Sequence, residues 1–224
     1  MEMDERIQRA IEQTEVLRLP KQSLATFGAT NIYYYLVTEL MDSATVVREG
    51  RVIAERPRIV TPAYLINLEG FSDRAGRFIE MMAEKYPGEP GIFYRYKNEP
   101  GDMNIVSEPL KRVVDKISQR IDDQQDPLSV IVKGLEELWD VSLLKFTYEL
   151  IKGSVYSNVA EFDRRGLLNM DEAGVPAGAR SYIEELFERT KEDQSRAPEL
   201  IAELRRWGLF PEYQDRFLSL FRKR

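Results

Sequence analysis

The feature that most constrains the fold of this chain is an uninterrupted run of apolar side chains, Ile32–Val37, within residues 30–38. β-branched and aromatic residues of this kind favour a β-strand. A strand with no polar interruption has no face left for solvent, as in the interior of a sheet that is covered on both sides. We therefore predict that Ile32–Val37 is a central strand.

The segments that follow predict two hairpins. Residues 45–56 contain two strand-like runs around Glu49-Gly50, and glycine supplies the positive φ that a tight turn requires. Arg58–Val60 resumes the sheet. Residues 92–97 alternate in polarity and are followed by a loop, 98–102, and by a short strand, 103–106.

Helical patterns surround this sheet. Residues 3–17 form an amphipathic stripe that ends before Pro20, and residues 62–69 and 73–86 are also helical in pattern. From Ser107 onward the chain is predicted to be helical throughout. The predicted helices begin at Ser107, Asp126-Pro127, Asp140 and, after a break at Gly153-Ser154, Val155, and three short ones follow at 179–191, 197–207 and 211–222.

These patterns predict an α+β fold: an antiparallel sheet of four to six strands with flanking helices, followed by a mostly helical C-terminal half. The expected core domain covers residues 1–168, with the sheet in 20–106 and helices in 107–168. The Gly- and Pro-bearing stretch 169–178 is the expected linker, and residues 179–224 form a C-terminal helical segment.

The chain has no cysteine and no histidine, which excludes several chemistries. Thiolate nucleophiles, Ser–His–acid triads and cysteine or imidazole metal sites cannot form. Asp122, Asp123 and Asp126 could offer oxygen ligands to a hard cation, but their spacing matches no calcium loop. We therefore expect no cofactor and no metal.

The formal net charge is −6 and neither half of the chain is basic, so nucleic acid is an unlikely partner. The acidic amino terminus lacks a signal-peptide pattern, and no apolar run approaches the roughly 20 residues of a membrane helix. We expect a cytoplasmic protein without membrane association. A charged fraction of 31% without cysteine is also compatible with a thermophilic source.

Candidate ligand-binding residues lie in the predicted strands. Tyr33 and Tyr35 could stack on a planar ligand, and Arg95 could hold an anion. Arg48 and Arg51 flank the predicted turn, so they would face each other across the hairpin and could attract an anion or an acidic partner. The alternative interpretation is that the aromatic residues build the core and that Glu49 and Glu55 neutralise the arginines.

The C-terminal segment carries more apolar residues than three short helices can bury among themselves. We predict an interaction surface formed by Trp207, Phe210, Phe217 and Phe221. Phe217 and Phe221 are expected to be buried against something outside the segment, either the preceding domain or another copy of the chain.

The functional hypothesis is a cofactor-free protein-binding or scaffolding protein that recognises a protein partner, or a second copy of itself as a homo-oligomer, through the C-terminal segment or a sheet edge. The alternative is a hydrolase-like enzyme that uses carboxylate, Tyr, Lys or Arg side chains in a cleft between the sheet and the helices.

Overall fold

The computed structural model describes residues 3–41, 43–61 and 91–222. The chain forms two compact units, each built from two stretches of sequence. The first comprises Met1–Arg56 and Tyr94–Asn158, and the second comprises Pro57–Phe93 and Val159–Arg224. The helices predicted at 62–69 and 73–86 lie outside the described residues.

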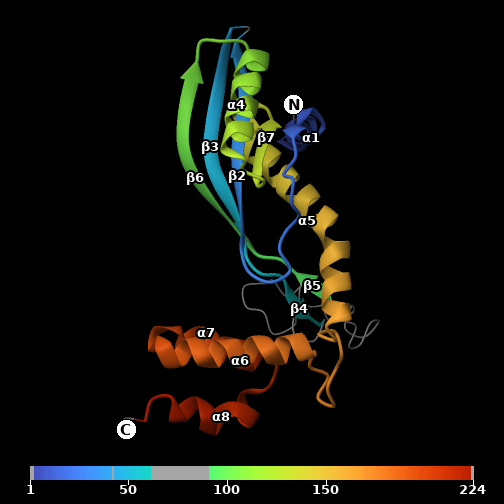
Figure 1. The fold of residues 1–224 in the computed structure, drawn as a ribbon, viewed down its shortest axis with the longest axis vertical. Coiled ribbons are helices and arrows are strands. Elements are labelled where there is room, and N and C mark those ends of the chain that lie inside the picture. The colour runs from blue at the N-terminus through green and yellow to red at the C-terminus, as the bar shows by residue number, and fades with distance from the viewer. Residues whose placement is uncertain (1–2, 42, 62–90, 223–224) are drawn as a thin grey trace. The chain divides into compact units, whose positions relative to one another are not determined.

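The first unit contains a five-stranded sheet with the strand order β1-β7-β2-β3-β6 (Figure 1). β2 (Thr30–Met41) is central, as predicted, and pairs with β3 (Ala44–Ala54) on one side. The remaining strands are β1 (Glu15–Arg18), β6 (Tyr96–Val106) and β7 (Ser129–Lys133). The predicted α+β class is confirmed, although the sheet is mixed, because β2 and β7 are parallel.

β7 corrects the prediction of a helix that begins at Asp126-Pro127. The Asp126 carboxylate accepts the backbone N–H of Leu128 at 2.9 Å and the hydroxyl of Ser129 at 2.7 Å, so it closes a turn into a strand. Residues 130–132 are β-branched and fully buried. Such side chains pack well on a pleated sheet, which explains why the strand forms here.

Both predicted hairpins are wrong in the position of their turns. β3 continues through Glu49-Gly50, and Gly50 has no positive φ. β6 likewise continues through the predicted loop 98–102, with a bulge where its register against β3 shifts between Arg48 and Gly50. Two long strands, β3 and β6, therefore stand where two short hairpins were expected.

The two faces of the sheet are packed by different helices. α4 (Leu110–Gln124) covers one face through Val113, Ile117 and Ile121. α5 (Trp139–Arg164) covers the other through Leu143 and Phe146. Alternate residues of β2 supply each cluster: Ile32, Tyr34 and Leu36 on the α5 side, and Tyr35 and Val37 on the α4 side.

Two predicted helix boundaries also change. α1 (Met3–Gln13) ends at Gln13, and the chain enters β1 directly. α5 runs unbroken through Gly153-Ser154, where the Ser154 hydroxyl donates to the Leu150 carbonyl at 2.8 Å. A short 3₁₀ turn, η1 (Glu136–Leu138), precedes α5.

The second unit contains the two-stranded sheet of β4 (Arg58–Val60) and β5 (Gly91–Phe93). α6 (Ala177–Glu192), η2 (Gln194–Arg196), α7 (Ala197–Arg206) and α8 (Phe210–Ser219) confirm the three predicted C-terminal helices within a few residues. Figure 1 shows α6 and α7 side by side, with α8 next to them. Their shared core includes Ile183, Leu186, Phe187, Leu200 and Leu204.

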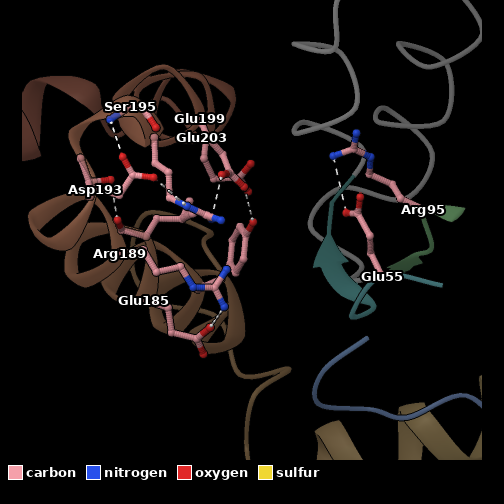
Figure 2. Close-up of polar contacts among 12 residues, drawn as sticks. Glu55, Arg95, Glu185, Arg189, Asp193, Ser195, Glu199 and Glu203 are labelled. Atoms are coloured by element: carbon pink, nitrogen blue, oxygen red, sulfur yellow. Dashed lines mark hydrogen bonds and ion pairs between the residues drawn. The ribbon is translucent and has the colours of Figure 1, made fainter. Parts of the chain in front are cut away.

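Polar contacts close the turn between α6 and α7 (Figure 2). The Asp193 carboxylate accepts the backbone N–H of Ser195 at 3.0 Å, and Arg189 pairs with Glu185 at 3.6 Å.

Glu203 is buried and pairs with Arg58 at 3.4 Å, and it also accepts the indole N–H of Trp207 at 3.2 Å. This carboxylate therefore ties β4 to α7.

Candidate functional site

The outer edge of β6 is the most distinctive surface of the first unit. Within the described residues β6 pairs only with β3, so its other edge presents backbone N–H and C=O groups that no described strand takes up. Figure 1 shows β6 at the margin of the sheet, beyond β3. Unpaired backbone groups of this kind are a template for another extended chain.

β6 is exposed along nearly its whole length; only Glu99 and Val106 are half-buried. Met103 is 59% exposed and Ile105 is 61% exposed. The part of β6 before Met103 carries Pro100, charged side chains and the bulge, all of which oppose pairing with a further strand. Met103–Val106 has none of these features, so this part is the accessible edge.

A groove lies beside this edge, between α4 and the sheet, and we call it the edge groove. Its volume is about 370 Å³. Thr45 fixes the end of the groove, because its hydroxyl donates to the Glu108 carbonyl at 2.9 Å just before α4 begins. The lining combines an apolar floor with charged walls and comprises Val47, Glu49, Asn104, Val106, Glu108, Val113, Lys116, Ile117 and Arg120.

Ion pairs form the walls of the edge groove. The Lys116 ammonium donates to both Glu108 oxygens at 2.6 and 2.8 Å, and Arg112 approaches the same carboxylate at 3.9 Å. Arg120 donates to Glu49 at 3.1 Å. The hydrogen bond from Lys116 holds the pKa of the Glu108 carboxyl below its ordinary value. The walls are therefore charged at neutral pH.

Charged side chains of β3 and β6 continue beyond the groove on the face of the sheet that α4 covers. Glu99 accepts hydrogen bonds from Lys97 at 2.8 Å and from Arg51 at 2.7 Å, which lower the pKa of its carboxyl. Arg51 lies directly opposite Tyr33, which is 43% exposed, and the Arg120 guanidinium lies 4.8 Å from the centre of the Tyr35 ring. The structure thus brings three predicted site residues, Tyr33, Tyr35 and Arg51, to one face.

Arg48 and Arg95 lie elsewhere. Arg48 and Arg51 both belong to the single strand β3, so they do not face each other across a hairpin. Position 51 is three residues after position 48, and their side chains therefore point to opposite faces of the sheet. Arg48 forms a bidentate ion pair with Glu136 at 2.8 and 2.5 Å and lies over Trp139. Arg95 pairs with Glu55 at 3.6 Å (Figure 2).

The predicted interaction residues of the C-terminal segment divide into two groups. Phe217 is 8% exposed and packs within the segment itself, against Phe210 at a ring-centroid distance of 6.0 Å, which corrects the expectation that it is buried elsewhere. Trp207 and Phe210 are half-buried at the margin of the same core. Phe221 remains 43% exposed.

Two adjoining hollows of about 260 and 570 Å³ lie near Glu39 and Glu136, between α1, β2 and η1. Acid–base hydrolysis by a carboxylate pair requires one carboxyl with a raised pKa. Here the hydrogen bond from Arg48 lowers the pKa of Glu136, and Thr38 donates a further hydrogen bond. Every described carboxyl with a displaced pKa is displaced downward.

Sequence reasoning missed β6 as an edge and the cations of α4. The available signal was the spacing of Arg112, Lys116 and Arg120, which recur every fourth residue beside the apolar stripe of the helix.

Among the described residues, no group of three or more acidic side chains is placed to hold a metal ion.

Comparison with family models, curated proteins and solved structures finds no significant match to this chain. In the described part of the chain, no helix has both the length and the apolar character needed to span a membrane.

Proposed function

We propose that this chain is a protein-binding module that takes up an extended segment of a partner polypeptide at the outer edge of β6. The observation that carries the proposal is an edge strand with exposed side chains, whose outer edge at Met103–Val106 no strand among the described residues pairs with, and a groove beside it. In this mode of recognition the backbone hydrogen bonds supply affinity, and pockets for alternate side chains supply specificity.

The side chains around the accessible edge fit such a partner. Met103 and Ile105 present an apolar surface on one face of β6, while Asn104 and Val106 border the edge groove on the other. A bound strand would place its alternate side chains on these two faces. The enzyme alternative lacks comparable support, because the pKa of the Glu136 carboxyl beside the two hollows is lowered by Arg48, whereas a general acid needs a raised one.

The test selects short peptides from a displayed library on the full chain and measures their affinity for two variants. Ile105→Lys places a charge on the edge, which blocks strand addition while leaving the exposed position folded. Leu144→Lys makes the same change at an exposed apolar position of α5 in the same unit.

We expect the selected peptides to bind the parent and Leu144→Lys equally and Ile105→Lys at least about tenfold more weakly. Amide hydrogen exchange of Met103–Val106 should slow on binding. Equal affinity for all three proteins, or binding that leaves β6 unprotected, would overturn the proposal.

A further inference from the structure

The accessible edge of β6 is symmetric in residue type about its second residue. Asn104 has an apolar residue on each side, Met103 before it and Ile105 after it. An interface between two identical chains related by a two-fold axis requires such symmetry, because the same surface patch serves on both sides. Resting on the proposed function, we infer that the extended segment bound at this edge is Met103–Val106 of a second copy of the chain.

The pairing that a two-fold axis imposes puts like residues together. Two strands related by an axis perpendicular to the sheet run antiparallel, and a residue on the axis faces its own copy. An axis at Asn104 places Met103 of each copy directly opposite Ile105 of the other. Directly opposite side chains in a sheet contact each other. Four side chains that are each more than half exposed in the single chain would thus form one apolar cluster.

An axis at either neighbouring residue gives a poorer match. An axis one residue earlier would place Val106 opposite Pro100, which has no N–H to donate to the added strand. An axis one residue later would place Asp102 opposite Glu108, and like charges directly opposite each other are unfavourable. The axis at Asn104 avoids both mismatches.

The other face of the segment is also compatible with an identical neighbour. The Asn104 amide carries donors as well as an acceptor, so two copies that face each other can exchange hydrogen bonds. The segment itself carries no charge. In the edge groove behind it, Lys116 pairs with Glu108 and Arg120 pairs with Glu49, so the charges of the lining are balanced. A second copy therefore meets no excess of like charge at this edge.

The segment is also left uncovered by the helices that pack on the sheet. Met103 and Ile105 belong to neither of the cores that α4 and α5 form with the sheet, which draw mainly on β2, β3 and β7. Figure 1 shows β6 as the outermost strand of this sheet. Pairing at Met103–Val106 would join the five-stranded sheets of two copies into one continuous sheet.

The alternative occupant of this edge is an unrelated extended peptide. Such a peptide would form the same backbone hydrogen bonds with β6. It would not need the symmetry of Met103 and Ile105 about Asn104, whereas a second copy does. The oligomeric state of the chain alone separates the two occupants.

The first experiment measures the mass of the full chain by sedimentation velocity over a concentration series. A short edge-to-edge interface is small, so we expect a dimer whose fraction rises with concentration. Ile105→Lys places a charge in the apolar cluster of each copy and should leave only monomer. Leu144→Lys makes the same change at an exposed apolar position of α5 and should dimerise as the parent does. A parent that stays monomeric, or equal dimerisation of both variants, would overturn the inference.

The second experiment tests the register by cross-linking, because the chain has no cysteine of its own. The Cα atoms of directly opposite residues are about 4.5–5.5 Å apart, which a disulfide can bridge. Asn104→Cys would therefore face its own copy. Met103→Cys would meet its copy only on the diagonal, at about 7–8 Å. Tyr156→Cys, at a position that is 85% exposed on α5, measures cross-linking by random collision.

We expect Asn104→Cys to form the covalent dimer under mild oxidation at least about tenfold faster than the other two variants, because pairing raises the effective concentration of its thiols. Adding Ile105→Lys to Asn104→Cys should abolish this advantage. Equal rates for Asn104→Cys and Tyr156→Cys would overturn the inference.

Failure of this inference differs from failure of the proposed function. If the parent is monomeric and selected peptides still bind it more tightly than they bind Ile105→Lys, the edge of β6 takes up other polypeptides and not a second copy. If no dimer forms, no peptide binds and the amides of β6 exchange unchanged, the proposed function itself is wrong.

Discussion

The ring of Tyr34 lies across Gly50 on the neighbouring strand, at the position directly opposite. A Cβ atom on Gly50 would lie 2.6 Å from Cζ of Tyr34 and 2.8 Å from the Glu99 carbonyl oxygen. Tyr34 is fully buried, and its hydroxyl donates to Asn98 on β6 at 3.1 Å. The absence of a side chain at Gly50 thus lets one tyrosine link three strands.

Gly50→Ala should therefore destabilise the protein by about 1–3 kcal/mol, because the added methyl overpacks the site and displaces Tyr34. Urea unfolding of the full chain measures the change. The control is Gly153→Ala on α5, where a Cβ meets nothing within 4 Å. That change should stabilise the helix by up to about 1 kcal/mol. Equal effects of the two substitutions would show that Tyr34 does not depend on Gly50.

The Arg48–Glu136 ion pair predicts a pH-dependent contribution to stability. Arg48 lowers the pKa of Glu136 below the ordinary 4.5. A carboxyl whose folded-state pKa is depressed stabilises the fold above its unfolded pKa, and this contribution is lost as the pH falls through the folded value. Glu136→Gln should cost about 1–2 kcal/mol near neutral pH.

The difference between Glu136→Gln and the parent should shrink as the pH drops below about 4.5. Glu137→Gln is the neighbouring control, since Glu137 is largely exposed and pairs only with Arg6 among the described ion pairs. Its cost should be below about 1 kcal/mol. A constant difference between Glu136→Gln and the parent across this pH range would contradict the assignment.

Removing the buried Glu203 carboxylate of the second unit is expected to lower the free energy of unfolding by more than Glu136→Gln does. Glu203→Ala leaves Arg58 and the indole N–H of Trp207 without this partner in a buried environment, so it should destabilise the protein by about 3–5 kcal/mol. Glu203→Gln retains an acceptor for Trp207 and should cost less. Glu199→Ala, at a half-exposed position of the same helix, should cost under about 1 kcal/mol in the same unfolding assay. A cost for Glu203→Ala as small as that for Glu199→Ala would be inconsistent with a structural role for the pair.

Phe217 and Phe221 are four residues apart near the C-terminus, and replacing each of them with alanine should change the stability of the protein by different amounts. Phe217→Ala opens a cavity in the core of the segment and should cost about 3–5 kcal/mol. Phe221→Ala removes a ring that is 43% exposed and should cost under about 1 kcal/mol. Chemical unfolding gives both values, and light scattering shows whether the mass of either variant differs from the parent. A lower mass for Phe221→Ala would identify a surface for self-association.

Local pattern was sufficient to predict the central strand and the C-terminal helices, because an uninterrupted run of aromatic and aliphatic residues favours a strand and prolines in the first turn mark the starts of α7 and α8. Gly50 was misplaced because a glycine that makes room for a neighbouring ring has the same sequence appearance as a turn glycine. Asp126-Pro127 was misread for a similar reason, since an aspartate that caps a helix can equally close a turn into a strand.

The candidate site was harder to predict than the fold. Tyr35 and Arg51 were identified from their residue types, but Arg120, which lies over Tyr35, and Glu99, which pairs with Arg51, come from elements that are distant in sequence. Which residues share a face of β6 depends on the bulge, which changes the alternation within the strand. The alternation of a bulged strand cannot be read from residue types alone.

The parallel pairing of β2 with β7 also has a consequence for synthesis on the ribosome. β2 and β3 are complete well before Ser129–Lys133 leaves the exit tunnel, so one flank of the apolar β2 has no partner during that interval. Closing such a long stretch of chain carries an entropic cost that slows pairing. The nascent chain therefore passes through a stage with an open, apolar strand flank, when aggregation and chaperone capture compete with folding.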